Sequence, residues 1–402
     1  MKILIVEDER ASALLLKAML QHWGYEVVHA TDGRVAWEIL HEQDIRLVIS
    51  DWMMPHMDGP ELCRRIRRSR LPGYVYVILL TARGESHSLV DGLEAGADDF
   101  VAKPFDKDEL HARLRAGMRI VRLEADLEQR NHRLEDAYRS MRQDLEAAAR
   151  MQRSLLPKPS AVLGGCGFDW LFVPSSFVAG DILDYFPVNN HEVAFYLLDV
   201  AGHGVRAAMH SVALSRLLST AHRRDRGRPG SSPDLHNAPA PSPAEVVRSL
   251  NARFENAGDA HSYFTMIYGS LDAHSGVARI VQAGHPSPIH QSGAGVQLVG
   301  TGGFAVGMLP DVDYEEFEVQ LEPGDRLLLY SDGVTECKNA SAEEFSTGRL
   351  LQSVQEHRAC AQSEALMALG RRLEQWRSED ASRDDITMLA IERLAGRHTS
   401  VV

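Results

Sequence analysis

The chain has few cysteines, no long apolar run and no excess of positive charge, and each absence excludes a class of protein. Its 4 cysteines lie far apart in the 402 residues, without the spacing of a metal site or a disulfide framework, as is typical of a reducing cytosol. No apolar run reaches transmembrane length, and residues 2–6 begin at once as a strand. We therefore expect no membrane span, no signal peptide and a cytoplasmic location.

Basic residues are outnumbered, with 43 Lys and Arg against 56 Asp and Glu, which gives a formal net charge of −13. Such an excess of acid disfavours the phosphate backbone of a nucleic acid as a partner, and we predict no nucleic-acid binding. The composition, 44% hydrophobic and 25% charged, is typical of a globular chain, and the length predicts a multidomain protein.

Proline and glycine are both absent from residues 120–155, where apolar residues recur at intervals of seven. The recurring residues are Ile120, Leu127, Leu134, Met141, Ala148 and Leu155. This repeat predicts a long helix that forms a two-stranded parallel coiled coil between two folded domains. A second seam is mixed over residues 131–138, where we expect a shift of register. A helix that lies on one of its own domains is the alternative, and Pro157 and Pro159 end the helix in either case.

Before this helix, strands alternate with helices, which predicts an α/β domain with a parallel, doubly wound sheet. The expected strands are residues 2–6, 26–29, 47–50, 76–80 and 99–102. In such sheets the chemistry lies beyond the carboxyl ends of the strands. Polar residues follow those ends: Glu7, Asp8, Asp51, Thr81 and Lys103. Three carboxylates suit a hard cation such as Mg²⁺, and the lysine and hydroxyl suit addition of a phosphoryl group to Asp51.

Residues 1–117 resemble the receiver domain of two-component response regulators, through the pair Glu7-Asp8, Asp51 in DWMMPHMDG, Thr81-Ala82 and Lys103-Pro104. The resemblance implies a flavodoxin-like fold and phosphorylation of Asp51 by a sensor histidine kinase. It implies a Mg²⁺ ion bound by Glu7, Asp8, Asp51 and the Met53 carbonyl. It also implies that Phe100 is a rotamer-switching aromatic and that the Lys103-Pro104 peptide is cis. An ordinary flavodoxin-like domain with polar strand ends is the alternative.

Beyond the helix, short β-rich stretches are interleaved with long helices, which predicts an α+β domain built as a β-sandwich flanked by helices. The expected strands are residues 168–173, 192–200, 263–272, 278–282, 326–330 and 386–391, and the expected helices are residues 204–223, 243–255 and 363–379. Residues 223–243 are rich in Pro, Gly and Ser, and we expect a mobile loop there.

Aspartates mark the ends of these β stretches: Asp181, Asp184, Asp199, Asp332, Asp384 and Asp385. Taken singly, each is more typical of a turn or a helix cap. Carboxylates that converge without cysteine favour Mg²⁺ or Mn²⁺ over zinc. Two such ions, about 3.5–4 Å apart, hold a phosphate and lower the pKa of a bridging water.

The order GD, DVAGHG, AGHPSP, SDG and DDIT resembles the SpoIIE/RsbU branch of the metal-dependent (PPM) Ser/Thr protein phosphatases over roughly residues 149–394. The preceding ARMQRSLLPKP matches the junction before that domain. The resemblance implies two Mn²⁺ or Mg²⁺ ions, with Asp199 bridging them and Asp184 in the outer shell. The implied ligands are Asp181, Asp199, the Val200 carbonyl, Asp332 and Asp384, with Asp385 as the alternative to Asp384.

The sequence departs from the family pattern at Ala179, where a second glycine is usual, and in the long insertion of residues 223–243. We expect His203 and His285 to be structural, with proton transfer or phosphate binding as the alternative for His203. Gly202 and Gly204 are expected to turn the backbone into the helix that follows.

Together these features predict a receiver domain over residues 1–117, a coiled-coil linker over 118–156, a phosphatase domain over 157–394 and a tail over 395–402. The predicted function is a homodimeric response regulator in which phosphorylation of Asp51 controls a protein-serine/threonine phosphatase. By resemblance, its substrate is a phosphorylated anti-sigma-factor antagonist of the STAS type. A catalytically silent scaffold is the first alternative, and it would require loss of a ligand. A nucleotide cyclase is the second, and it would require a GGDEF-like motif, which the sequence lacks.

Overall fold

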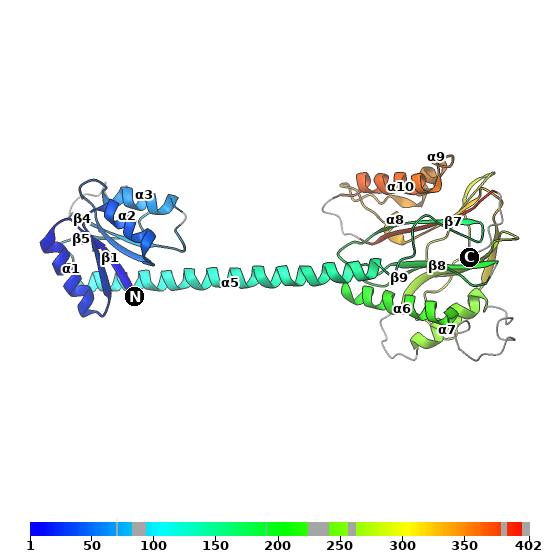
Figure 1. Cartoon of the computed structure of the whole chain (residues 1–402), viewed down its shortest axis with the longest axis horizontal. Coiled ribbons are helices and arrows are strands. Elements are labelled where there is room, and N and C mark those ends of the chain that lie inside the picture. Colours follow the sequence, from blue (N-terminus) through cyan, green and yellow to red (C-terminus); the bar gives the residue numbers. More distant parts are fainter. Residues whose placement is uncertain are drawn as a thin grey trace. The chain divides into compact units, whose positions relative to one another are not determined.

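The structure is a computed structural model of the chain (Figure 1), and it describes residues 1–69, 71–82, 94–189, 191–223, 241–255, 263–378 and 384–395. The chain divides into two compact units, Met1–Met141 and Arg142–Val402. The division falls within a single long helix, α5 (Lys107–Arg153). Among the residues that the structure describes, no helix combines the length and the apolar character needed to cross a membrane. Most of the expected loop over residues 223–243 and most of the expected tail lie outside the described residues.

The first unit contains a five-stranded parallel sheet in the order β2-β1-β3-β4-β5. Its strands are β1 (Lys2–Val6), β2 (Glu26–Ala30), β3 (Leu47–Asp51), β4 (Tyr76–Ala82) and β5 (Asp99–Lys103). Helices α2 (Gly33–Glu42) and α3 (Gly59–Arg68) pack on one face, and α1 (Arg10–His22) and the start of α5 pack on the other. This is the doubly wound sheet that the alternating pattern predicts.

Side-chain caps begin two of these helices. Asp32 Oδ1 accepts hydrogen bonds from the amides of Arg34 (2.7 Å) and Val35 (3.0 Å), and Asp58 Oδ1 accepts one from Glu61 (2.8 Å). Each cap satisfies amides that have no partner within the first turn of a helix. The side chain of Asp58 therefore caps the N-terminus of α3.

Helix α5 begins inside the first unit, thirteen residues before the heptad repeat starts at Ile120. Leu110 and Leu114 are fully buried against the sheet, and Gly117 lies against the ring of Tyr76, where a Cβ would come within 2.6 Å of a ring carbon. The linker therefore continues the last helix of the receiver-like unit and is not a separate element. Further along, Leu127, Leu134 and Met141 are 54%, 68% and 54% exposed in the single chain. Their pairing in a coiled coil stays a prediction.

The second unit contains two antiparallel sheets, in the orders β14-β11-β10-β9-β8 and β13-β12-β15-β16-β7-β6. The first consists of β8 (Ile182–Pro187), β9 (Glu192–Val200), β10 (Phe264–Asp272), β11 (Val277–Ala283) and β14 (Glu316–Gln320). The second consists of β6 (Ala161–Leu163), β7 (Cys166–Val173), β12 (Ile289–Ser292), β13 (Gly295–Leu298), β15 (Arg326–Tyr330) and β16 (Ile386–Arg393).

The two sheets face each other across one apolar core, which takes buried side chains such as Phe195, Leu197 and Ile267 from the first sheet and Leu329 and Leu389 from the second. Helices α6 (Val205–Arg223) and α7 (Pro243–Glu255) cover the outer face of the first sheet. Helices α9 (Ser346–Glu356) and α10 (Gln362–Trp376) cover the outer face of the second (Figure 1). The short helix α8 (Asp332–Thr335) follows β15. These layers bring the ends of strands from both sheets to one edge.

Candidate functional site

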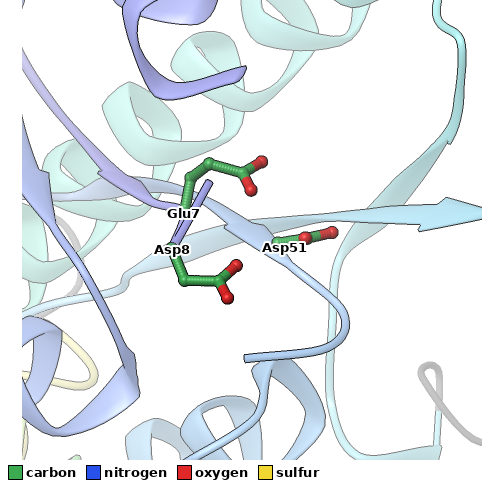
Figure 2. A group of neighbouring side chains, drawn as sticks. All are labelled: Glu7, Asp8 and Asp51. Atoms are coloured by element: carbon green, nitrogen blue, oxygen red, sulfur yellow. The ribbon is translucent and has the colours of Figure 1, made fainter. Parts of the chain in front are cut away.

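In the first unit, three acidic side chains meet at the carboxyl ends of β1 and β3. Glu7, Asp8 and Asp51 each offer a carboxylate oxygen, and these oxygens lie within 4.8 Å of one another (Figure 2). Among the described residues this is the one group of three or more His, Cys, Asp or Glu side chains with ligand atoms so close. Lys103 Nζ, at the end of β5, lies 2.8 Å from Glu7 Oε2 and 3.0 Å from Asp51 Oδ2.

Burial and charge act against each other in this cluster. Burial raises the pKa of Glu7, although its hydrogen bond with Lys103 lowers it in part. Burial alone would lower the pKa of Lys103, but its hydrogen bonds with Glu7 and Asp51 outweigh burial and raise it. Lys103 is therefore held as a cation against two carboxylates. The negative charge that remains, and the close oxygens, fit a hard divalent cation.

The other predicted receiver residues lie around this cluster. Thr81 is buried near the end of β4, Phe100 packs half-buried on the face covered by α2 and α3, and the side chain of Met53 is exposed. The peptide bond between Lys103 and Pro104 is cis, as the resemblance implies.

In the second unit, the predicted aspartates come to one edge from both sheets. Asp181 directly precedes β8, and Asp199 lies near the end of β9, whose Leu198 pairs with Ile182. Asp332 starts α8 directly after β15. Asp384 lies just before β16, whose first residues extend past the end of β15, because Tyr330 at that end pairs with Met388. Adjacent strand ends therefore carry all four carboxylates.

Burial and neighbouring carboxylates raise the pKa of Asp181, Asp199 and Asp332. Burial, followed by the charge of Asp199, raises the pKa of Asp181 well above its usual range. Burial, followed by the charges of Asp332 and Asp384, raises the pKa of Asp199 to about 7. Burial and the charge of Asp384 raise the pKa of Asp332 to about 6. The cause in each case is carboxylates that are partly dehydrated and repel each other.

An oxygen without a partner supports a metal at this edge. Asp181 is 1% exposed, and its Oδ2 has no hydrogen-bond partner among the described residues. A buried carboxylate oxygen without a donor is costly unless a cation binds it. No three of the aspartates bring oxygens within 4.8 Å of one another, in contrast to the first unit. The unpartnered oxygen and the mutual repulsion of the carboxylates fit a divalent cation at this edge.

The structure gives Asp384 and Asp385 different environments. Asp385 is 4% exposed, and its two oxygens accept hydrogen bonds from the amides of Ser175 and Gly180, each at 2.6 Å. Asp384 is exposed, and its charge raises the pKa of both Asp199 and Asp332. The charge of Asp385 also raises the pKa of Asp181 and Asp199, so both carboxylates act on the cluster, and Asp385 differs in that backbone amides bind both of its oxygens.

Two family models match this chain. The model of the response regulator receiver domain matches residues 3–115. The model of stage II sporulation protein E (SpoIIE) matches residues 189–394, just over half of the chain. The chain belongs to the SpoIIE family. The expected receiver domain and SpoIIE-type phosphatase domain are thereby confirmed.

Curated relatives match the receiver part. The probable transcriptional regulator ycf27 of Galdieria sulphuraria is 45% identical over 121 residues, which are 30% of this chain and 46% of that protein. The phosphate regulon transcriptional regulatory protein PhoB of Rhizobium meliloti is 40% identical over 151 residues, which are 35% of this chain and 66% of that protein. The chain thus spans about half to two thirds of the length of these relatives.

A solved structure matches the second unit. The SiaA-PP2C domain of Pseudomonas aeruginosa covers 64% of this chain and 98% of that domain, with 23% sequence identity and a TM-score of 0.54. At this identity the likeness establishes the fold alone. The SpoIIE domain therefore has a PP2C-type fold.

Gln152, in the last turn of α5, is a residue of the SpoIIE domain's site to which the sequence pattern assigned no role. Its side chain is 3% exposed and binds both backbone groups of Ala179: Nε2 donates to the carbonyl at 2.7 Å, and Oε1 accepts from the amide at 3.0 Å. Nε2 also lies 3.3 Å from Ser211 Oγ on α6. The linker helix is thus bonded to the loop that carries Asp181. The motif ARMQRSLLPKP contains Gln152, but only the folded structure shows that its partner is the backbone of Ala179.

The glycines of the SpoIIE domain allow close approach at the site. Gly180 lies so near the Val200 carbonyl that an added Cβ would come within 3.0 Å of its oxygen. Gly202 and Gly204 have φ values of +95° and +83°, the left-handed region that favours glycine, and they lead into α6 as expected. Ala179 is fully buried and makes the backbone bonds to Gln152 described above.

The remaining candidates, His285, His203 and Asp184, lie in different surroundings, and their roles stay predictions. His285 is buried, its Nδ1 lies 2.8 Å from Thr265 Oγ1, and burial lowers its pKa to about 3, so it stays neutral. His203 is exposed in the glycine turn. Asp184 is half-buried, and its Oδ1 accepts a hydrogen bond from the amide of Tyr185 at 2.8 Å.

Proposed function

We propose that the chain is a response regulator in which phosphorylation of Asp51 controls a metal-dependent protein-serine/threonine phosphatase. The observation that carries the proposal is the group of four aspartates at the edge of the two sheets, whose carboxylates repel one another and include a buried oxygen without a partner. A site that is electrostatically strained in this way is stabilised by divalent cations.

The proposed ligands of two Mn²⁺ or Mg²⁺ ions are Asp181, Asp199, the Val200 carbonyl, Asp332 and Asp384. Ions bound there supply a water of lowered pKa as the nucleophile and positive charge for the phosphate. The charges of Asp332 and Asp384, which come from the other sheet, both raise the pKa of Asp199, so it is the residue suited to bridge both ions. The glycine turn before α6 leaves room for a phosphorylated side chain to approach.

In the receiver domain, the proposed acceptor of the phosphoryl group is Asp51, with a sensor histidine kinase as the donor. A Mg²⁺ ion would be bound by Glu7, Asp8, Asp51 and the Met53 carbonyl. Lys103 already contacts Asp51 at 3.0 Å, where it neutralises charge on the acceptor. We propose that Thr81 and Phe100 respond to the phosphoryl group, since both flank this end of the sheet.

Membership of the SpoIIE family supports a phosphorylated STAS-type anti-sigma-factor antagonist as the substrate. The exposed apolar residues Leu127, Leu134 and Met141 of α5 support a homodimer formed through a coiled coil over residues 118–156. The receiver would occupy residues 1–117 and the phosphatase residues 157–394.

The test measures phosphate release from a purified phosphorylated STAS protein, with and without Mn²⁺ and with and without acetyl phosphate. We expect release that requires Mn²⁺ and that changes when Asp51 is phosphorylated. Asp384→Asn serves as the control for the metal centre. Mn²⁺-independent release, or release that Asp384→Asn leaves intact, would refute the proposed centre.

A further inference from the structure

Asp385 is the most constrained carboxylate at the edge of the SpoIIE domain. Its Oδ1 accepts a hydrogen bond from the Ser175 amide and its Oδ2 one from the Gly180 amide, both at 2.6 Å and across more than 200 residues of sequence. Residues 174–181 connect β7 to β8 without regular secondary structure, so few ladder bonds fix them. The carboxylate of Asp385 therefore closes this connection at its two ends, directly beside Asp181.

The backbone of Asp385 reaches a second ligand-bearing segment. Its carbonyl accepts a hydrogen bond from Ser331 Oγ at 3.1 Å, and it lies so close to Gly333 that an added Cβ would come within 2.1 Å of its oxygen. Asp332 lies between these two residues. The amide of Asp385 donates to Asp384 Oδ1 at 2.8 Å, which holds the third carboxylate.

We propose that Asp385 is a positioning residue of the phosphatase, which binds no metal and fixes the relative positions of Asp181, Asp332 and Asp384. The proposal rests on the proposed function, since it concerns the same metal centre. Both oxygens of Asp385 accept backbone-amide hydrogen bonds, which hold its carboxylate against the connection between β7 and β8. Charge-assisted hydrogen bonds of this kind are roughly twice as strong as neutral ones, which makes them suited to hold a loop in place.

The test compares Asp385→Asn with Asp384→Asn in the full chain. Asparagine keeps the size of the side chain but replaces one acceptor oxygen with a donor, which loses one of the two amide bonds. Asp169→Asn is the matched control, because Asp169 is also buried and accepts two hydrogen bonds, from Ser160 Oγ and the Trp170 amide. Bound Mn²⁺ is counted by electron paramagnetic resonance, and the half-saturating Mn²⁺ concentration is measured with p-nitrophenyl phosphate.

We expect Asp385→Asn to bind as many Mn²⁺ ions as the wild type, with a half-saturating concentration raised roughly 10- to 100-fold and a kcat close to wild type at saturating Mn²⁺. Asp384→Asn is expected to lose one ion, with no recovery of kcat at high Mn²⁺. Asp169→Asn should leave the half-saturating concentration unchanged. Ser175→Pro removes one of the two amide donors without altering Asp385, and it should shift the Mn²⁺ requirement in the same direction.

Loss of one Mn²⁺ ion in Asp385→Asn would make Asp385 a ligand and overturn the inference. An unchanged Mn²⁺ requirement in both Asp385→Asn and Ser175→Pro would overturn it too, as would a shift of equal size in Asp169→Asn. If Asp385→Asn does not fold, Ser175→Pro decides alone. A wild-type protein that neither binds Mn²⁺ at this edge nor hydrolyses the phosphate ester would instead refute the proposed function.

Discussion

Replacing Gln152 with leucine removes the bond between the linker helix and the loop that carries Asp181. Leucine fills nearly the same volume but cannot bind the backbone of Ala179. The amide of Ala179 loses its acceptor at 3.0 Å, and its carbonyl loses the donor at 2.7 Å. Ser211 Oγ, at 3.4 Å, still reaches that carbonyl, so the amide is the group left without a partner.

The cost follows from burial, because Ala179 is 0% exposed and water cannot replace the lost partner. A buried donor without an acceptor costs about 1–3 kcal/mol, and the weakened carbonyl bond adds to this. We take 2–3 kcal/mol as the rough total, which raises the population of a displaced Asp181 loop roughly 30- to 150-fold. We therefore expect a higher Mn²⁺ requirement, a lower free energy of unfolding of the SpoIIE domain, and loss of the response to Asp51 phosphorylation.

The assay combines urea unfolding with Mn²⁺ titration of phosphatase activity, with and without beryllofluoride. Gln143→Leu is the control, since Gln143 is exposed on the same helix. If Gln152→Leu matches Gln143→Leu in the free energy of unfolding, the Mn²⁺ requirement and the response to beryllofluoride, the bond has no role in positioning Asp181.

Four further predictions concern the two sites and the linker. Asp199→Asn should abolish turnover in Mn²⁺ while circular dichroism stays near wild type, because it removes charge and no apolar packing. Asp51→Ala should block labelling by acetyl phosphate and hold phosphatase activity at one level; undiminished labelling would place the acceptor elsewhere. Without metal, the melting temperature should fall as pH rises from about 4 to 7. Over this range folded Asp199, with a pKa of about 7, retains a proton that the unfolded chain releases. Saturating Mn²⁺ should flatten this dependence of the melting temperature on pH. Leu134→Asp combined with Met141→Asp should give a monomer by light scattering, since each buried apolar side chain is worth about 1.5–3 kcal/mol, and its activity should no longer respond to beryllofluoride.

Strands with continuous apolar runs were predictable from sequence, and β1, β9 and β15 have the expected bounds. Strand β8 was not predicted, because Asp184 and Pro187 interrupt its six residues, and pairing with β9 decides its conformation. The start of α5 was placed too late. Leu110 and Leu114 pack on the receiver's own sheet and so lie outside the heptad seam that marks the later part of the helix.

The order of the motifs was enough to nominate the aspartates, because each lies at a strand end with its own local signature. It could not separate Asp384 from Asp385, since neighbouring residues at a strand end point to opposite sides and the sequence does not say which side holds the cluster. We base our choice of Asp384 on Ser175 and Gly180, whose amides bind Asp385 and lie more than 200 residues earlier in the sequence. The role of Gln152 was hidden for the same reason, because its partner is backbone and leaves no pattern in the side chains.

The two acidic clusters differ in what balances their charge, and this difference bears on how the chain would be controlled. In the receiver, Lys103 contacts both Glu7 and Asp51, so a protein cation already offsets part of the charge before any metal binds. In the SpoIIE domain, burial and other carboxylates outweigh the hydrogen bonds that lower the pKa of Asp181 and Asp332, so we expect metal to be the main compensation. Small movements of the Asp181 loop would therefore change metal affinity steeply. Gln152 binds the Ala179 carbonyl and Asp385 binds the Gly180 amide, which belong to the same peptide unit, and we propose that a signal carried by α5 would reach the centre through it.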